Sequence, residues 1–254
     1  AIETEEGEVI TADLVLVAAG VAPDWFAQLG ISVLERPTPN TALVFNASFP
    51  GQQSGRAFER FTENGPLAVL PLQTLSHADQ RYNVVWSVSN STATTFGDLD
   101  DEAFRNHFQE AFGWRLGRVQ AVGRRSQWPL MRLSASEQFR AGFLLVGNAA
   151  HTLHPVAGQG LNLSLREAGL LAKAIADAQQ RSAAIGCCAS LKTYLDQVSD
   201  EQRLVVDSTD ALAILFNRRG PLLDVPRDAS LALLDLLPAI RQQVASVGTG
   251  RRYA

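Results

Sequence analysis

The sequence predicts a mixed α/β fold of the α+β kind, and three observations support this prediction. An apolar run at residues 143–146 leads through a glycine turn into a long helical pattern, which is typical of a strand, a turn and a helix. Short strand-like runs between residues 42 and 88 are separated by turn residues, which favours an antiparallel sheet. Apolar residues recur at helical spacing after residue 190, which predicts C-terminal helices.

The composition is that of an ordinary globular protein. The chain has 254 residues, of which 46% are hydrophobic and 19% charged, and its net charge is −4. A mildly acidic chain lacks the basic surface that a nucleic-acid partner favours. No apolar run approaches the roughly 20 residues that span a bilayer. The only cysteines, Cys187 and Cys188, are adjacent and lack a second pair to build a metal site.

The N-terminal residues predict a β-hairpin over 3–10, with its turn at Glu6-Gly7, and then a buried strand over 12–19. This pattern is typical of the middle of a dinucleotide-binding domain. The Gly-x-Gly-x-x-Gly turn that begins such domains does not occur in the sequence. We therefore expect the chain to be a fragment that lacks an N-terminal segment.

The middle of the chain predicts four strands, over residues 42–47, 56–61, 67–72 and 81–88. Because the connections between them are short, we expect neighbouring strands to be antiparallel. A helix is predicted over 98–112, starting at Asp98 or Asp100, because acidic residues favour the first turn of a helix.

The region from Gly142 to Ala178 predicts a buried strand, a small-residue turn at Gly147-Asn148, and a helix that begins near Gly158. The first backbone N–H groups of a helix have no partner within it, and the helix dipole is positive at that end. This arrangement favours an anion or an electron-rich carbonyl as ligand. His151 and His154 lack a nearby carboxylate or thiolate in the turn, so the pattern predicts no metal site.

The C-terminal region predicts a long helix over 191–217, which ends at the basic residues and Gly-Pro of 218–221. Pro238 interrupts a second helical pattern over 229–247. The leucine-rich faces of these helices favour packing within the molecule, and a membrane surface is the alternative that we leave open.

Several runs together resemble the class A flavoprotein aromatic hydroxylases, which have the para-hydroxybenzoate hydroxylase fold. Within this family the sequence is most similar to the ubiquinone-biosynthesis branch. The runs that carry the resemblance are Gly147-Asn148, His154-Pro155, Gly158-Gln159-Gly160-Leu161-Asn162, residues 56–72, and Trp128-Pro129-Leu130. Two positions depart from the family pattern: Ala19 and Pro23 stand where the family has Asp and Ser, and the run from Asp13 to Asp24 also resembles flavin disulfide reductases.

The resemblance implies an FAD-dependent monooxygenase that uses NAD(P)H and O2, through a flavin C4a-hydroperoxide, to hydroxylate a prenylated phenol. It implies flavin contacts at Gly147, Asn148, Pro155, Gly158, Gln159, Gly160, Leu161 and Asn162. Among these, Pro155 shapes the reacting edge of the ring and is the catalytic candidate. Apolar residues suited to the walls of a substrate pocket, each of which also suits an ordinary core, are Phe61, Leu70, Leu72, Trp86, Trp128 and Leu130.

The predicted organisation follows from these assignments. Residues 1–40 are the remnant of an FAD-binding domain, 41–135 a substrate-binding β-sheet domain, 136–180 the FAD-binding strand, turn and helix, and 181–254 a C-terminal helical region. The resemblance implies a cytoplasmic protein, with the periphery of the inner membrane, ubiquinone-pathway proteins and a second copy of the chain as open partners. The alternative function is that of a non-catalytic fragment, which keeps substrate-binding and assembly surfaces but does not hold FAD alone.

Overall fold

The structure is a computed structural model that describes residues 1–21, 23–50, 55–73, 79–140, 142–152, 158–217 and 242. The predicted helix stop at 218–221, the helical pattern around Pro238, and the residues His154 and Pro155 lie outside the described residues. The chain divides into two compact units. Unit one consists mainly of residues 1–36 and 131–215, and unit two mainly of residues 37–130.

Unit one contains a small sheet in which β11 (Phe143–Leu145) lies between β10 (Phe139–Arg140) and β3 (Val15–Val17). β11 and β3 are parallel, as in a dinucleotide-binding domain. The short helix α1 (Pro23–Leu29) follows β3, and Phe26 from it packs into the cluster that also contains Leu145. The predicted N-terminal hairpin is confirmed, since β1 (Ile2–Glu3) pairs antiparallel with β2 (Val9–Ile10). β3 covers only residues 15–17 of the buried strand predicted over 12–19.

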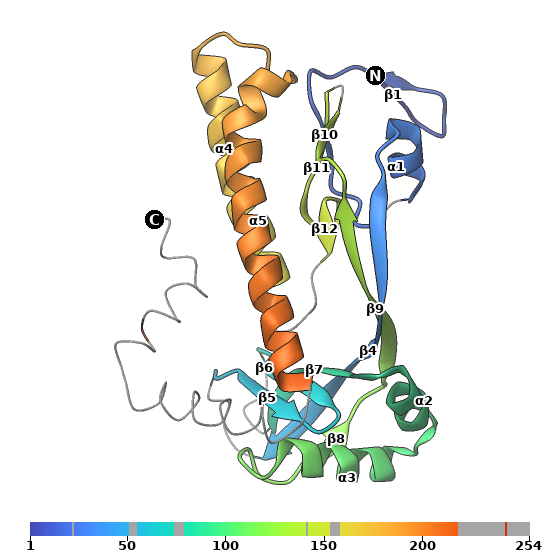
Figure 1. The fold of residues 1–254 in the computed structure, drawn as a ribbon. Helices are drawn as coiled ribbons and strands as arrows, with labels where there is room; N and C mark the ends of the chain where they lie inside the picture. The colour runs from blue at the N-terminus through green and yellow to red at the C-terminus, as the bar shows by residue number, and fades with distance from the viewer. Residues whose placement is uncertain are drawn as a thin grey trace. The chain divides into compact units, whose positions relative to one another are not determined.

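Two long helices, α4 (Gln159–Gln180) and α5 (Cys188–Asn217), run side by side in unit one (Figure 1). Leu171 of α4 and Tyr194 and Val198 of α5 are buried in one apolar cluster, together with Leu144 of β11. This cluster attaches the helix pair to the small sheet. Both helices were predicted, and α5 begins three residues earlier than the apolar pattern indicates.

Unit two is built on antiparallel strands, as predicted. β4 (Val33–Pro50) pairs with β7 (Asp79–Ser89), β7 with β6 (Gly65–Pro71), and β6 with β5 (Phe58–Thr62). The complete sheet has the order β12-β9-β4-β7-β6-β5, with β8 (Ala121–Val122) beside β4. Its remaining strands are β9 (Ser126–Ala135), whose end belongs to unit one, and β12 (His151–Thr152), which lies entirely in unit one.

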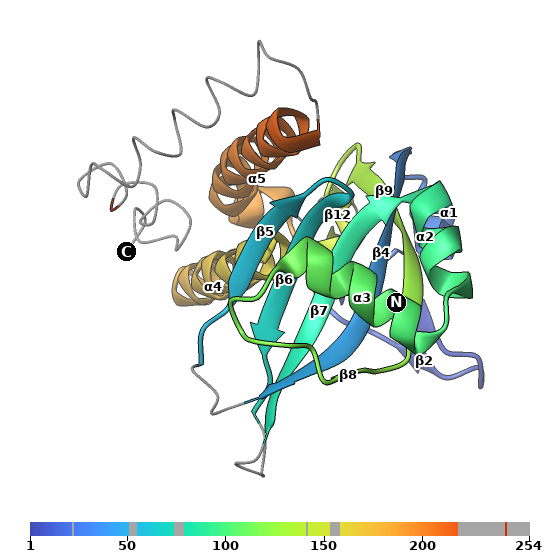
Figure 2. The same ribbon diagram turned by 90° about the horizontal axis from the view of Figure 1, so that it is seen from below.

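Helices α2 (Asn90–Asp98) and α3 (Asp101–Phe112) cover one face of the unit-two sheet (Figure 2). Asp100 caps α3, because its Oδ1 atom accepts a hydrogen bond of 2.7 Å from the Ala103 N–H. Beneath the helices lies an aromatic core, in which Phe45 meets Phe104 and Phe108 edge to face at ring-centroid distances of 4.9 and 5.2 Å. Such edge-to-face pairs stabilise beyond the burial of their area.

The sequence analysis missed helix α2 and strand β9, as well as the short elements α1, β8, β10 and β12. Helix α2 begins where Ser89 accepts a hydrogen bond from the Thr92 N–H, but its sequence is rich in Ser and Thr, which are weak helix formers. Strand β9 contains Pro129, and Pro37 and Pro39 lie in the first half of β4. Proline cannot donate to a sheet, so its presence argued against strands at both places.

The aromatic core predicts where unit two is sensitive to truncation. Phe108→Ala removes a side chain with 0% exposure, whereas Trp114→Ala removes one that is 69% exposed. We expect the free energy of unfolding to fall by about 3–5 kcal/mol in the first variant and by about 0.5 kcal/mol or less in the second. Chemical denaturation measures both values, and equal losses would contradict this packing.

Candidate functional site

An open groove of about 630 Å³ lies within unit one, between the end of β3, the turn after β11, and helix α4. Its walls are largely apolar. Leu16 of β3 is 46% exposed and Leu161 of α4 is 70% exposed. The other lining residues are Ala18, Gly20, Val146, Gly147, Asn148, Gly160, Ser164, Glu167, Ala168, Leu171, Ala172 and Ile175. Exposed apolar surface gathered in a concave site is typical of a ligand-binding groove.

The turn after β11 forms one edge of the groove. Residues Gly147–Ala149 form a short 3-10 turn, and Gly147 has a φ of +58°, in the left-handed region that favours glycine. A Cβ atom at this position would also stand 3.4 Å from the Ser164 hydroxyl of α4. The turn and the helix therefore approach each other closely, and a glycine allows them to do so.

The start of α4 forms the opposite edge. Gly158 precedes the helix in the left-handed conformation and, as a glycine, has no side chain that could cap it. The first N–H groups of α4 and the positive end of the helix dipole lie at this edge. A Cβ atom at Gly160 would meet no heavy atom within 4 Å, so this residue leaves open space beside the helix. The arrangement suits a flat ligand with a negative or electron-rich edge.

The structure brings together four of the residues predicted to contact a flavin, namely Gly147, Asn148, Gly160 and Leu161, all of which line the groove. Gly158, Gln159 and Asn162 lie at the start of α4 but are not among the lining residues. Pro155, the catalytic candidate, lies outside the described residues.

The residues predicted to line the substrate pocket do not all lie on the same face of the unit-two sheet. Strand register pairs Phe61 with Pro66 and Leu70 with Asn83, on the face away from α2 and α3. Leu72 follows β6, and its N–H bonds to the Arg81 carbonyl. The register places Leu72 and Leu70 on the same face, because side chains alternate along a strand.

Two more candidates come from β9. The Gln127 amide bonds to the Ala93 carbonyl on α2, so Trp128 and Leu130 point to the other face. Trp128 is 63% exposed.

The structure corrects the prediction that Trp86 lines the substrate pocket. Its side chain has 0% exposure and packs in the core beneath the helices, 5.1 Å from the Phe96 ring between centroids. It pairs across the sheet with Leu43 and Leu67, which are also in that core. The indole therefore leaves no surface for a ligand on the open face, and Trp86 is removed from the pocket walls.

Sequence reasoning missed part of the groove. The sequence analysis identified an apolar face on α4 from its helical periodicity, and the structure shows that Leu161, Leu165, Ala168 and Ala172 on this face are exposed. Periodicity identified the face correctly, yet it does not show whether protein or ligand covers it. The run from Asp13 to Asp24 was recognised as similar to flavoproteins, but Leu16, Ala18 and Gly20 at the end of β3 were not among the predicted flavin contacts.

Within the part of the chain that the structure describes, no three His, Cys, Asp or Glu side chains are grouped so that they hold a metal ion. None of the described helices is both long and apolar enough to cross a membrane.

Comparison with known proteins identifies the family to which the chain belongs. Residues 2–209 match the model of a family described as an FAD binding domain. The chain belongs to this family of FAD-binding flavoproteins.

Two curated relatives are hydroxylases. The chain is 32% identical, over 84% of its length, to ubiquinone hydroxylase UbiL of Rhodospirillum rubrum. It is 26% identical, over 98% of its length, to 3-demethoxyubiquinol 3-hydroxylase of Escherichia coli. The chain spans only 48% of the first relative and 62% of the second.

A solved structure shares the fold. The crystal structure of PqsL, described as a probable FAD-dependent monooxygenase from Pseudomonas aeruginosa, superposes with a TM-score of 0.66 at 23% sequence identity. The match covers 85% of this chain and 59% of PqsL.

The groove fits the ring portion of FAD. Its apolar walls suit the flat faces of an isoalloxazine, and the start of α4, with the positive end of its dipole, suits the carbonyl edge. Gly147 and Gly160 keep side chains out of the two edges of the groove. These residues and the backbone of the first turn of α4 would hold the ring.

The two glycines respond differently to the same substitution. Gly147→Ala forces a left-handed φ on a residue with a Cβ atom, which we expect to lower the free energy of unfolding by about 1–2 kcal/mol. Gly160→Ala enters open space in a helix and should be neutral or stabilising by up to about 1 kcal/mol. Urea denaturation of both variants tests this, and a destabilised Gly160→Ala would contradict the geometry.

Proposed function

We propose that this chain forms the flavin-ring portion of an FAD-dependent monooxygenase, which uses NAD(P)H and O2 to hydroxylate a prenylated phenol in ubiquinone biosynthesis. The observation that carries the proposal is the apolar groove between the Gly147-Asn148 turn and the start of α4. The family match and the two hydroxylase relatives support the reaction class. The ring position that is hydroxylated is left to product analysis.

The chain's own residues contribute charge stabilisation and exclusion of water. Bound FAD supplies the redox chemistry and the activation of O2. The N–H groups in the first turn of α4 would donate to the carbonyl edge of the ring and stabilise negative charge there, because the helix orients them. Leu16 and Leu161 would cover apolar ring surface and keep water away from it. Pro155 remains a proposal for the residue that shapes the reacting edge.

The open face of the unit-two sheet supports a substrate with a large apolar part. Phe61 is 37% exposed and Leu70 is 41% exposed, and Trp128 presents its side chain on the same face. Exposed aromatic and aliphatic side chains of this kind suit a prenylated ring. Asn83 and Asn46 lie on the same face, joined by a hydrogen bond of 3.3 Å, and provide polar groups beside the apolar ones.

A second candidate function is that of a non-catalytic portion that binds substrate or partners without holding FAD. The observation that favours it is the lack of a Gly-x-Gly-x-x-Gly turn, because this turn holds the ADP half of FAD in dinucleotide-binding domains. A purified chain that is colourless and binds a prenylphenol would support this candidate.

A matched pair of glycines in α4 tests the proposed function. Gly160 lines the groove and Gly169 does not, and a Cβ atom at either position meets nothing within 4 Å. Gly160→Leu fills the groove, so we expect loss of bound FAD and failure to restore ubiquinone in a hydroxylase-deficient strain. Gly169→Leu should retain both properties. Flavin absorbance of the purified protein and quinone extraction measure the outcomes, and full FAD content in Gly160→Leu would contradict the assignment.

A further inference from the structure

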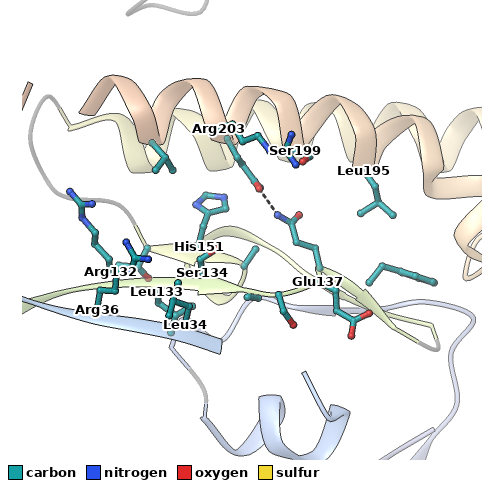
Figure 3. A pocket seen from close by; sticks show the side chains of 18 of the residues that line it. Leu34, Arg36, Arg132, Leu133, Ser134, Glu137, His151, Leu195, Ser199 and Arg203 are labelled. Atoms are coloured by element: carbon teal, nitrogen blue, oxygen red, sulfur yellow. Dashed lines mark hydrogen bonds between the residues drawn. The ribbon is translucent and has the colours of Figure 1, made fainter. Parts of the chain in front are cut away.

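A network of hydrogen-bonded polar side chains, buried at Glu167 and His151, joins four separate segments of unit one. His151 on β12 has its Nε2 atom 2.8 Å from Oε1 of Glu167 on α4. The Gln202 side-chain amide on α5 donates a hydrogen bond of 2.8 Å to the same oxygen. Gln202 in turn accepts a hydrogen bond from the Gln138 amide, just before β10. Figure 3 shows His151 on the strand side of a cavity, facing α5, and its dashed line marks the bond between the two glutamines.

This hydrogen-bonded network is shielded from water at Glu167 and His151. Glu167 is 2% exposed and His151 is 6% exposed. Burial and the charge of Glu167 both raise the pKa of Tyr194, so the phenol beside this carboxylate stays neutral. A buried carboxylate is costly unless donors satisfy it. The hydrogen bonds from His151 and Gln202 are therefore a condition for packing α4 at this position.

The contact between His151 and Glu167 closes a loop in the sequence. The two residues are sixteen positions apart, and the run Gly158–Asn162 lies between them. The Gly147–Ala149 turn comes directly before β12. One buried contact thus fixes the two ends of the segment that contains most of the residues assigned to the flavin. Fixing α4 relative to β12 limits the positions that the first turn of the helix can take beside the Gly147–Ala149 turn, so ligand binding has less freedom to remove.

We propose that Glu167 and His151 are positioning residues of the flavin site, whose contact holds the first turn of α4 in register with the Gly147-Asn148 turn. The two residues act through the backbone that they hold. This inference rests on the proposed function, because it concerns the same groove. It adds that binding of the flavin ring depends on a buried hydrogen-bonded contact of Glu167 in the groove wall that α4 forms.

A neighbouring contact provides a control. Arg166 bonds to Glu201, so it also joins α4 to α5, and both side chains are partly shielded, at 22% and 10% exposure. This ion pair makes no connection to β12. Arg166→Met therefore removes a polar contact between the same two helices without opening the loop that His151 and Glu167 close.

The test compares three variants of the flavin-binding protein. Glu167→Leu leaves the His151 and Gln202 donors without an acceptor, and we expect FAD to bind about tenfold more weakly or worse. Glu167→Gln keeps an oxygen that accepts from both donors and should restore most of the affinity. Arg166→Met should bind FAD within about twofold of the unaltered protein. Fluorescence titration of the apoprotein with FAD gives the dissociation constants, and visible circular dichroism reports the environment of the bound ring.

Thermal unfolding without FAD separates a positioning role from general destabilisation. Unchanged FAD affinity and ring dichroism in a folded Glu167→Leu protein would overturn the inference while leaving the proposed function in place. If Glu167→Leu does not fold, His151→Asn is measured instead, with the same expected weakening. Failure of the unaltered protein to bind FAD would overturn the proposed function itself.

Discussion

The carboxylate of Glu167 imposes the strongest constraint on unit one. The Glu167 side chain is 2% exposed, so its carboxylate needs hydrogen-bond donors close by. These are His151 on β12 and Gln202 on α5. The contact joins α4 to the short strand β12 that follows the glycine turn. The apolar cluster around Tyr194 packs the same helix against α5. The same helix presents Leu161, Ala168 and Ala172 to the groove, which Glu167 also lines.

Unit two depends on a different constraint, the alternation of side chains along strands. Phe45, Val84 and Trp86 point toward the helices and form the core, whereas Leu70 and Trp128 point away from it. One face of the sheet is therefore committed to stability. The other face presents exposed side chains, Leu70 and Trp128 among them, and is the face proposed for the substrate.

The sequence predicted the parts of the fold that have strong local patterns. The apolar periodicity of α4, the acidic start of α3 and the short turns between β5, β6 and β7 each identified an element. Prolines 37, 39 and 129 obscured the extent of β4 and β9, because pairing in the sheet outweighed local preference there. For the site, the glycine turn was recognisable from its motif. The misplacement of Trp86 shows that residue type alone does not reveal which face of a strand is open.

The contact between His151 and Glu167 was also beyond prediction, because it joins residues whose proximity depends on how β12 and α4 pack. The most direct test of the central claim is a crystal structure of the protein with FAD bound. The account predicts the isoalloxazine ring in the groove between Gly147 and Gly160, with a ring carbonyl within about 3 Å of an N–H in the first turn of α4. A ring bound elsewhere, with this groove filled by protein side chains, would contradict it.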